Sequence, residues 1–321
     1  MDLGDTRRRY LGGQRHSAID LEEPYRHVFE YTRYFHLPYL FAGDPDEIDR
    51  VLFVGGGGFT GPRRFVHEYK NVTVDVAEID PEVIAAATEY FGVEESPRLN
   101  IYNRGGRQFL RETNRTYDLV VLDAYQRDKV PFELTTREFM SLASSRLDED
   151  GILFANVISA ASGPASQFYR AEYRTMSRVC PQVYGFPTVG GGVVQNIEIV
   201  ATNNDTRISE AELLARNERR DIGIDLRAEV WTYAPPPPTD DVPVLRDDRA
   251  PVDSLLDPMV GQRYVIQESN GTESTTGEES VDGDDSRDRG DSGDGDDRRT
   301  ESQAIDPAAV GSARSAVEAA T

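Results

Sequence analysis

A cluster of glycines between two apolar runs, within residues 51–80, constrains the fold of this chain more than any other feature. Residues 51–54 read VLFV, and the second run, residues 72–76, leads to Glu78 and Asp80. Four consecutive glycines follow the first run: Gly55, Gly56, Gly57 and Gly58. A strand, a glycine turn, a helix and a second strand in this order predict the first β-α-β unit of a nucleotide-binding fold.

The glycine cluster and the acidic end of the second strand have a physical reason to bind a nucleoside. Without a Cβ, glycines let the backbone turn sharply and let a ligand touch it. Pro62 suits the first turn of the following helix, which Thr60 or Gly61 can cap. Glu78 lies 23 positions after Gly55, close to the spacing of roughly 20 at which such folds present a carboxylate to ribose hydroxyls. A tight strand-to-helix turn without a ligand is the alternative.

The remaining pattern predicts a single large sheet. Strands are expected at residues 99–102, 117–122 and 152–158, alternating with helices. Residues 183–186 and 195–201 flank a glycine turn and should pair as an antiparallel hairpin. A hairpin ending favours an α/β fold with a seven-stranded methyltransferase-type, Rossmann-like sheet over a dinucleotide dehydrogenase, whose second half would repeat β-α-β units.

Helix-capping signals mark two of the expected helices. Asp80 can cap a helix that continues through Pro81 and stops at Gly92, which gives Asp80 a structural role beside a binding one. Thr135 and Glu138 have the spacing of a capping box.

Four segments are expected along the chain. They are an N-terminal hairpin or lid segment (residues 1–47), the Rossmann-like domain (48–232), a proline-rich linker and docking segment (233–265) and a disordered acidic tail (266–321). The tail holds too few apolar residues to offset the entropy of ordering. The apolar residues of the docking segment can pack on the core.

Charge and composition limit the partners of this protein. The net charge is −22 over 321 residues, and Lys70 and Lys129 are the only lysines. An acidic, lysine-poor chain suggests adaptation to high salt, disfavours nucleic acid and attracts cationic small molecules. Neither an apolar stretch long enough to span a membrane nor a signal peptide is evident, so a cytoplasmic location is the expectation. One cysteine and four histidines without ligand spacing predict no metal.

The strand at residues 117–122 delivers Asp123 to the carboxyl edge of the sheet, where ligands bind in open α/β folds. The loop that follows, residues 123–134, carries Tyr125 and Asp128. Asp123 is the main catalytic candidate. Tyr125 and Asp128 are weaker ones, because exposed loop residues usually pack or solvate.

Taken in order, the segments VLFVGGGGFTGPRRF, VAEIDPEVI, GGRQFL, YDLVVLDAYQRDKVPFELTTREFM and GILFANVI resemble the spermidine synthase (aminopropyltransferase) family, in its divergent spermidine-synthase-like branch. The resemblance covers roughly residues 12–256. It implies a co-substrate, decarboxylated S-adenosylmethionine or S-adenosylmethionine itself, with Glu78 on the ribose. It also implies that Asp123 acts on an attacking amine, that no metal takes part, and that the protein is a homodimer.

This sequence departs from the family pattern at three acidic positions. The aspartate that holds the amino end of the aminopropyl group corresponds to Gly58, and the one that recognises the adenine amino group corresponds to Gly105. The second loop carboxylate corresponds to Gln126, although Asp128 lies two residues later.

Three functions remain open on these residues. The first is an aminopropyl transfer to a polyamine or another amine, favoured by Asp123 and the acidic loop. The second is an S-adenosylmethionine-dependent methyl transfer, favoured by Gly58, where no carboxylate would repel that of the ligand. The third is a nucleoside-binding or scaffold protein without chemistry, favoured by the missing contacts.

Overall fold

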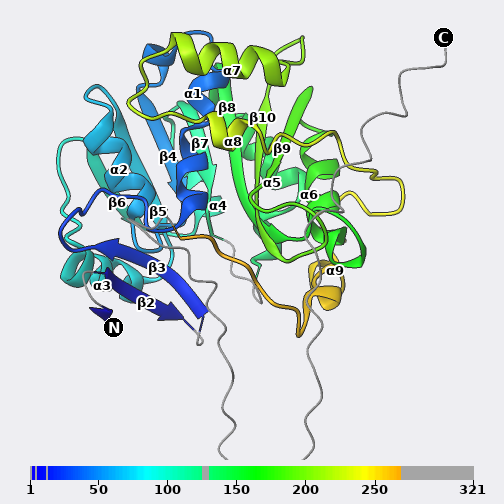
Figure 1. Ribbon diagram of the computed structural model, residues 1–321, viewed down its shortest axis with the longest axis horizontal. Helices are drawn as coiled ribbons and strands as arrows, with labels where there is room; N and C mark the ends of the chain where they lie inside the picture. Colours follow the sequence, from blue (N-terminus) through cyan, green and yellow to red (C-terminus); the bar gives the residue numbers. More distant parts are fainter. Residues whose placement is uncertain (1, 4–5, 12–13, 125–129, 269–321) are drawn as a thin grey trace, which may run out of the picture. The chain divides into compact units, whose positions relative to one another are not determined.

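The central sheet of the protein has seven strands in the order β6-β5-β4-β7-β8-β10-β9 (Figure 1). Their bounds are β4 (Arg50–Val54), β5 (Thr73–Glu78), β6 (Leu99–Asn103), β7 (Tyr117–Leu122), β8 (Leu147–Ser159), β9 (Gln182–Pro187) and β10 (Gln195–Thr202). The first five are parallel, and β10 is antiparallel to both β8 and β9. The predicted methyltransferase-type sheet with a terminal hairpin is confirmed.

The computed structural model describes residues 2–3, 6–11, 14–124 and 130–268. Within them, strand order reverses at β4, because β5 lies on one side of it and β7 on the other. Such a reversal opens a crevice at the carboxyl ends of the strands, where ligands bind. The fold therefore places the ends of β4, β5 and β7 around one site.

Helices cover both faces of the sheet. The α-helices are α1 (Pro38–Phe41), α2 (Thr60–Glu68), α3 (Pro81–Phe91), α4 (Gly106–Glu112), α5 (Arg137–Ser144), α6 (Gln167–Met176), α7 (Glu210–Arg219), α8 (Arg227–Val230) and α9 (Val252–Leu256). The 3-10 helices are η1 (Glu30–His36), η2 (Pro45–Glu47), η3 (Phe132–Leu134), η4 (Pro164–Ser166) and η5 (Asp257–Met259). Helices α4, α5, α6 and α9 pack on one face, and α1, α2, α3, α7, α8 and η1 on the other.

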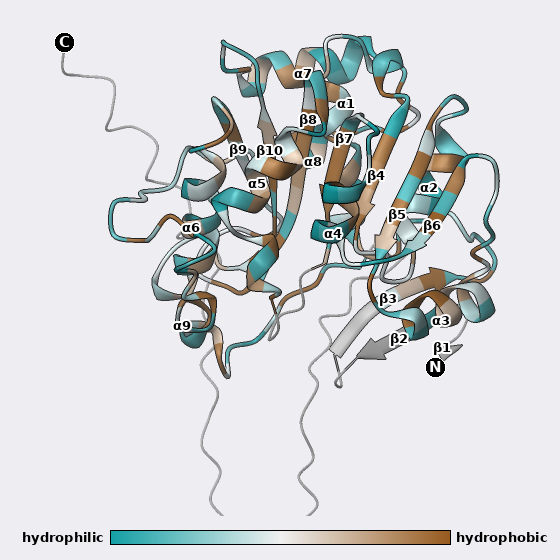
Figure 2. Ribbon diagram, turned by 180° about the vertical axis from the view of Figure 1, so that it is seen from behind, coloured by the Kyte–Doolittle hydropathy of each residue, from teal (hydrophilic) through white to brown (hydrophobic). Residues whose placement is uncertain are grey.

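Strand β4 illustrates why the sheet is apolar on both sides. Leu52 and Val54 join the core of the α4–α6 face, while Val51 and Phe53 join the core of the opposite face. Side chains alternate along a strand, so a parallel strand covered on both faces must be apolar throughout. Figure 2 shows these inner strands in the brown of hydrophobic residues, against a largely teal α7.

The N-terminal segment forms a separate antiparallel sheet of β1 (Asp2–Leu3), β2 (Thr6–Leu11) and β3 (Gln14–Asp20). The predicted hairpin is thus confirmed, with two further residues added as β1. The guanidinium of Arg7 on β2 donates to the carbonyl of Tyr90 on α3, at 3.1 Å. Figure 1 shows β2 and β3 beside this helix. Helical segments η1 and α1, not a further strand, lead from there toward the main sheet.

Of the helix caps predicted from the sequence, one is confirmed and two are wrong. Asp80 caps α3 by accepting from the backbone N–H of Glu82, and Gly92 ends it with φ of 61°. Helix α2 begins at Thr60 behind Phe59, which has φ of 57°, so the expected cap by Thr60 or Gly61 is wrong. Helix α5 is capped by Thr136 instead of Thr135.

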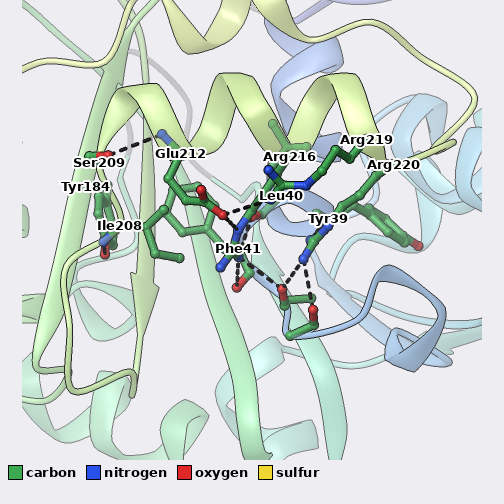
Figure 3. A network of polar contacts seen from close by, with 12 residues as sticks. Tyr39, Leu40, Phe41, Tyr184, Ile208, Ser209, Glu212, Arg216, Arg219 and Arg220 are labelled. Atoms are coloured by element: carbon green, nitrogen blue, oxygen red, sulfur yellow. Dashed lines mark hydrogen bonds and ion pairs between the residues drawn. The ribbon is translucent and has the colours of Figure 1, made fainter.

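Two arginines at the C-terminal end of α7 form hydrogen bonds with the carboxyl end of α1 (Figure 3). Arg216 donates to the carbonyls of Leu40, Phe41 and Ala42, and Arg220 donates to those of Tyr39, Ala42 and Gly43. Carbonyls at a helix end have no partner within the helix. The two guanidinium groups provide donors for these carbonyls and link residues 39–43 to residues 216–220.

The segment at residues 233–265, for which docking is predicted, adds Val242, Leu245, Val252 and Leu255 to the core of the α4–α6 face. Leu245 is fully buried, and its backbone N–H donates to the Thr175 hydroxyl at 2.9 Å. Residues 269–321, which hold nearly all of the expected acidic tail, lie outside the described residues.

Candidate functional site

A cavity of about 890 Å³ lies at the carboxyl ends of β4, β5, β6 and β7. Six residues singled out from the sequence line it: Gly55, Gly57, Glu78, Asp80, Gly105 and Asp123. A pocket of this volume is in the range of small-molecule and cofactor sites. The fold therefore brings together residues that are up to 68 positions apart in the chain.

Gly55 brings the end of β4 against the end of β7. Its φ is 92°, and a Cβ there would lie 2.5 Å from the carbonyl oxygen of Asp123. Only glycine satisfies both this close approach and this backbone conformation. The backbone N–H of Asp123 donates to the Val54 carbonyl at 2.9 Å, which fixes the glycine turn and Asp123 side by side.

Two glycines of the cluster, Gly56 and Gly58, do not line the cavity. A Cβ on Gly56 would lie 2.4 Å from the ring of Phe59, which is fully buried beneath the turn and is not part of the cavity wall. A Cβ on Gly58 would lie 2.4 Å from the Cβ of Ser17 on β3. Both positions lack a side chain for packing reasons, and no aspartate fits at Gly58 while Ser17 is in place.

The carboxylate of Glu78 is held firmly at the end of β5. Its Oε2 accepts from the backbone N–H of Gly56 at 2.8 Å, and its Oε1 accepts from that of Asp80 at 2.9 Å. Each carboxylate oxygen can accept a second hydrogen bond. Glu78 is thus oriented by the backbone and keeps accepting capacity toward the cavity that it lines.

Around Gly105 the cavity has both an apolar and a basic part. Ile79 is 70% exposed although it is a large apolar residue, and its Cδ1 lies 3.5 Å from where a Cβ of Gly105 would be. Arg104 and Arg107 line the cavity too, but they pair with Glu112 and Asp247. The surface beside Gly105 therefore suits a flat apolar ring, with Arg104 and Arg107 already paired.

Asp123 is the half-buried acid of the site. Its Oδ1 accepts from the side-chain amide of Asn156 on β8 at 2.8 Å. Burial raises the pKa of Asp123 to about 7; the amide hydrogen bond opposes this rise, and the charge of Glu78 adds to it. A carboxyl group whose pKa lies near 7 can accept a proton at neutral pH and release it again.

Polar residues that the sequence analysis did not single out continue from Asp123 across the sheet. The amide of Asn196 on β10 donates to Oδ1 of Asn156 at 2.8 Å, and the hydroxyl of Tyr264 donates to Oδ1 of Asn196 at 2.6 Å. Asn156 lies in the buried, largely apolar part of β8, and Asn196 lies in the fully buried strand β10. Amide side chains inside buried strands were the available signal for them.

Glu198 on β10 lies opposite Asn156 in the strand register and is fully buried. Burial, and then the nearby charge of Asp123, raise the pKa of Glu198 well above its usual value. Sequence reasoning treated this stretch only as a strand of the terminal hairpin and did not identify the residue.

Two of the catalytic candidates, Tyr125 and Asp128, lie outside the described residues, as does Gln126. Within residues 14–124 and 130–268, no group of three or more His, Cys, Asp or Glu side chains has the arrangement of a metal site. In the same part of the chain, no helix is long and apolar enough to cross a membrane.

Comparison with known proteins identifies the relatives of this chain. It is 28% identical over 211 residues to the polyamine aminopropyltransferase of Vibrio vulnificus, covering 63% of this chain and 68% of that protein. It is 30% identical over 156 residues to the polyamine aminopropyltransferase of Chromobacterium violaceum, covering 48% of this chain and 58% of that one. The chain thus spans about two thirds or less of the length of these relatives.

Solved structures show the same fold. A probable spermidine synthase from Corynebacterium glutamicum superposes with a TM-score of 0.59 at 20% identity, covering 75% of this chain and 91% of that one. Spermidine synthase from Thermotoga maritima gives a TM-score of 0.55 at 20% identity, with coverages of 71% and 76%. A profile of the spermine/spermidine synthase domain matches residues 29–197. From this match, which takes in the glycine turn, Glu78 and Asp123, it follows that the chain belongs to the spermine/spermidine synthase family.

Proposed function

We propose that this protein is an aminopropyltransferase, which moves an aminopropyl group from decarboxylated S-adenosylmethionine to an amine. The observation that carries the proposal is the pairing, in one cavity, of the backbone-held carboxylate of Glu78 with the half-buried acid Asp123. Relatives named polyamine aminopropyltransferase support the same reaction class.

The half of the cavity between β4 and β6 suits the nucleoside. Glu78 has accepting capacity for ribose hydroxyls, and the glycine turn allows close approach of the ligand to the backbone. Ile79 and Gly105 offer an apolar surface for the adenine ring. The sulfonium carries a positive charge, which the carboxylates of Glu78 and Asp123 on opposite sides of the glycine turn favour.

The half of the cavity next to β7 suits the aminopropyl transfer step. The amine nitrogen attacks the carbon bound to the sulfonium, a C–N bond forms, and the C–S bond breaks with its electron pair going to sulfur. The products are methylthioadenosine and an aminopropylated amine that must lose one proton. Asp123 accepts this proton, and a pKa of about 7 suits an acid that cycles between both forms at neutral pH. Positioning of the amine in line with the C–S bond supplies much of the rate.

Methyl transfer from S-adenosylmethionine is the second candidate, and one observation bears on it. Ser17 fills the space that an aspartate at Gly58 would need, so no carboxylate repels that of S-adenosylmethionine there. The raised pKa of Asp123 still favours an amine nucleophile that loses a proton. A scaffold without chemistry remains the third candidate.

Calorimetry with decarboxylated S-adenosylmethionine, S-adenosylmethionine and methylthioadenosine, combined with product analysis by mass spectrometry, tests the proposal. The acidic composition calls for buffers with molar salt. Aminopropylated putrescine and methylthioadenosine are expected as products. A methylated amine would support the second candidate, and absence of binding heat with all three nucleosides would support the scaffold.

We also propose that the protein is a homodimer, as the family resemblance implies. Light scattering coupled to size-exclusion chromatography at the same salt concentration tests this, and a monomeric mass would refute it.

A further inference from the structure

A segment that follows η5, residues 260–268, runs along the carboxyl edge of the central sheet, and we call it the strap. The backbone N–H of Val265 donates to the carbonyl of Val194 at 2.8 Å, just before β10, which begins opposite the last residue of β8. Further along, the carbonyl of Gln267 accepts from the N–H of Glu30 on η1 at 2.9 Å. Figure 1 shows the strap in orange, running from α9 toward the N-terminal sheet. The strap is thus fixed at two points along the edge where β7 and β8 end.

One side chain of the strap, Tyr264, is connected to Asp123 through two buried amides. The hydroxyl of Tyr264 donates to Oδ1 of Asn196 at 2.6 Å, and Nδ2 of Asn196 donates to Oδ1 of Asn156 at 2.8 Å. Nδ2 of Asn156 then donates to Oδ1 of Asp123 at 2.8 Å. Asn196 and Asn156 are 2% and 5% exposed, so the protein itself supplies their hydrogen-bond partners. Three hydrogen bonds in series therefore join the strap to the proposed base.

The strand register explains why these side chains meet. Asn196 lies opposite Ile158, which is two residues after Asn156 on β8. Residues two apart on a strand project to the same face, so the two asparagines are diagonal neighbours across the strand pair and within reach of each other. Tyr264 bridges to Val194, two residues before Asn196, in parallel orientation. The strap thus places the tyrosine beside the first of the two amides.

The direction of this hydrogen-bond chain is set at the strap. A tyrosine hydroxyl has one proton to donate, and a carboxamide has one donating and one accepting end. Because Tyr264 donates to the oxygen of Asn196, the nitrogen of Asn196 faces Asn156. The nitrogen of Asn156 consequently faces Asp123. Without the hydroxyl both amides are free to turn, and a turned Asn156 presents its oxygen to the carboxyl group, which can share a hydrogen bond with that oxygen only when protonated.

Asp123 depends on this amide because its other neighbours are acidic or neutral. Burial raises the pKa of Asp123, the hydrogen bond from Asn156 lowers it, and the charge of Glu78 raises it further. Glu198 on β10 and Tyr31 on η1 also interact electrostatically with Asp123. Among the described residues, no arginine, lysine or histidine contributes to this balance. The orientation of the Asn156 amide is therefore the main factor that favours the ionised base.

We propose that Tyr264 is a positioning residue, whose hydroxyl keeps the two amides turned so that Asn156 donates to Asp123. This inference rests on the proposed function, in which Asp123 accepts the proton of the amine. Tyr264 lies outside residues 29–197, which the family profile matches. The strap thus contributes to the state of the base from a part of the chain beyond the matched domain.

The pH dependence of kcat/KM for putrescine tests the inference in Tyr264→Phe. Loss of the hydroxyl should move the acid limb to higher pH by about 0.5 to 1 unit, which corresponds to the usual net contribution of one hydrogen bond. At about pH 6.5, kcat/KM should fall about three- to eightfold, whereas near pH 9, where the base is ionised in both proteins, the two values should be nearly equal. An acid limb that stays in place, or a loss of the same size at every pH, would overturn the inference.

Tyr173→Phe is the matched control. The hydroxyl of Tyr173 on α6 also donates at 2.6 Å, but to the carbonyl of Val183, and it takes no part in the chain to Asp123. The control should leave the acid limb in place, and thermal melts should show that both phenylalanine variants are folded. A shift of the limb in the control equal to that in Tyr264→Phe would refute the positioning role.

A double substitution tests whether the hydroxyl acts through the amides. Asn156→Ala already breaks the chain, so adding Tyr264→Phe to it should cause no further shift of the acid limb. Equal shifts with and without Asn156 would show that the tyrosine acts on the base by another route and would refute the inference.

A titration without turnover separates this inference from the proposed function. Isotope-labelled aspartate allows the carboxyl carbon of Asp123 to be followed by NMR in the wild type and in Tyr264→Phe, with its signal assigned by its absence in Asp123→Asn. A higher pKa in Tyr264→Phe, without aminopropyl transfer by the wild type, would uphold the positioning role and refute the proposed function. Transfer by the wild type with the same pKa in both proteins would uphold the function and refute the positioning role. Neither transfer nor a difference in pKa would refute both.

Discussion

Asp75 and Glu198 are both buried carboxylates inside strands of the same sheet, yet their hydrogen bonding differs completely. Asp75 on β5 accepts from the Asn100 amide at 2.9 Å, from the Arg115 guanidinium at 2.6 Å and from the Tyr117 hydroxyl at 2.8 Å. Glu198 on β10 has no partner among the described residues. Burial alone therefore does not determine whether a carboxylate in this sheet is hydrogen-bonded.

The difference between the two acids follows from their place in the sheet. Asp75 lies near the start of β5, away from the strand ends that surround the cavity, and its neighbours supply all the donors that a carboxylate needs. Glu198 lies one strand beyond Asn156, whose amide is already directed at Asp123. We expect substitutions at Asp75 and at Glu198 to change stability in opposite directions.

The largest effect is expected at Asp123, the proposed base, whose carboxylate accepts from Asn156 alone among the described residues. Asp123→Asn removes the group that accepts the proton of the amine, and turnover should fall about 10²- to 10⁴-fold, the usual contribution of a general base. Affinity for methylthioadenosine should change little, because Glu78 and the glycine turn remain. Steady-state kinetics and calorimetry measure the two quantities, and unchanged turnover would exclude Asp123 as the base.

At Asp75 the expected loss is in stability. Asp75→Ala leaves the Tyr117 hydroxyl buried without an acceptor, together with the Asn100 amide, and should lower the free energy of unfolding by about 3 kcal/mol. Urea denaturation measures this. Phe53→Leu, a conservative change in the same buried sheet, serves as the control and should cost clearly less. A loss at Asp75 no larger than the control would break the comparison with Glu198.

Glu198→Gln should raise the free energy of unfolding, in contrast to Asp75→Ala. In the folded protein the pKa of Glu198 is raised, so the unfolded state loses its proton first as the pH rises and folding becomes less favourable. The variant should therefore be more stable than the wild type at pH 8 and lose this advantage well below pH 4, where the carboxyl group is neutral in both states. Thermal melts across this pH range measure the difference. Destabilisation at pH 8 would mean that the carboxylate is satisfied after all.

The smallest expected effect is on the pH dependence of kcat/KM. Because the pKa of Asp123 is about 7, kcat/KM should rise about tenfold per pH unit on the acid side and level off above pH 7. In Asn156→Ala the acid limb should move to higher pH, since the amide hydrogen bond favours the ionised form. An acid limb that stays in place in this variant would argue against Asp123 as the titrating group.

Features that depend on local sequence could be predicted. The glycine turn, the two flanking strands and the cap at Asp80 follow from neighbouring residues, and so does the delivery of Glu78 and Asp123 to one edge of the sheet. The first residue of α5 could not be predicted from the local sequence, because Thr135 and Thr136 are both good N-cap residues. The choice depends on distant contacts, including the Thr136 hydroxyl donating to Asp247 at 2.6 Å.

The polar residues beyond Asp123 could not be predicted, because their neighbours come from distant parts of the chain. Asn156 lies within β8, whereas Asn196 and Glu198 lie within β10. Their common face becomes apparent only when β10 is known to insert between β8 and β9. Polar residues in buried strands can be noticed in a sequence, but their partners, or the lack of them, cannot.

The contact between Gly58 and Ser17 also couples two distant parts of the chain. Any side chain at position 58 would collide with the Cβ of Ser17 on β3. An acid engineered at position 58 therefore needs a second change at position 17, so the turn after β4 and the N-terminal sheet have to be redesigned together.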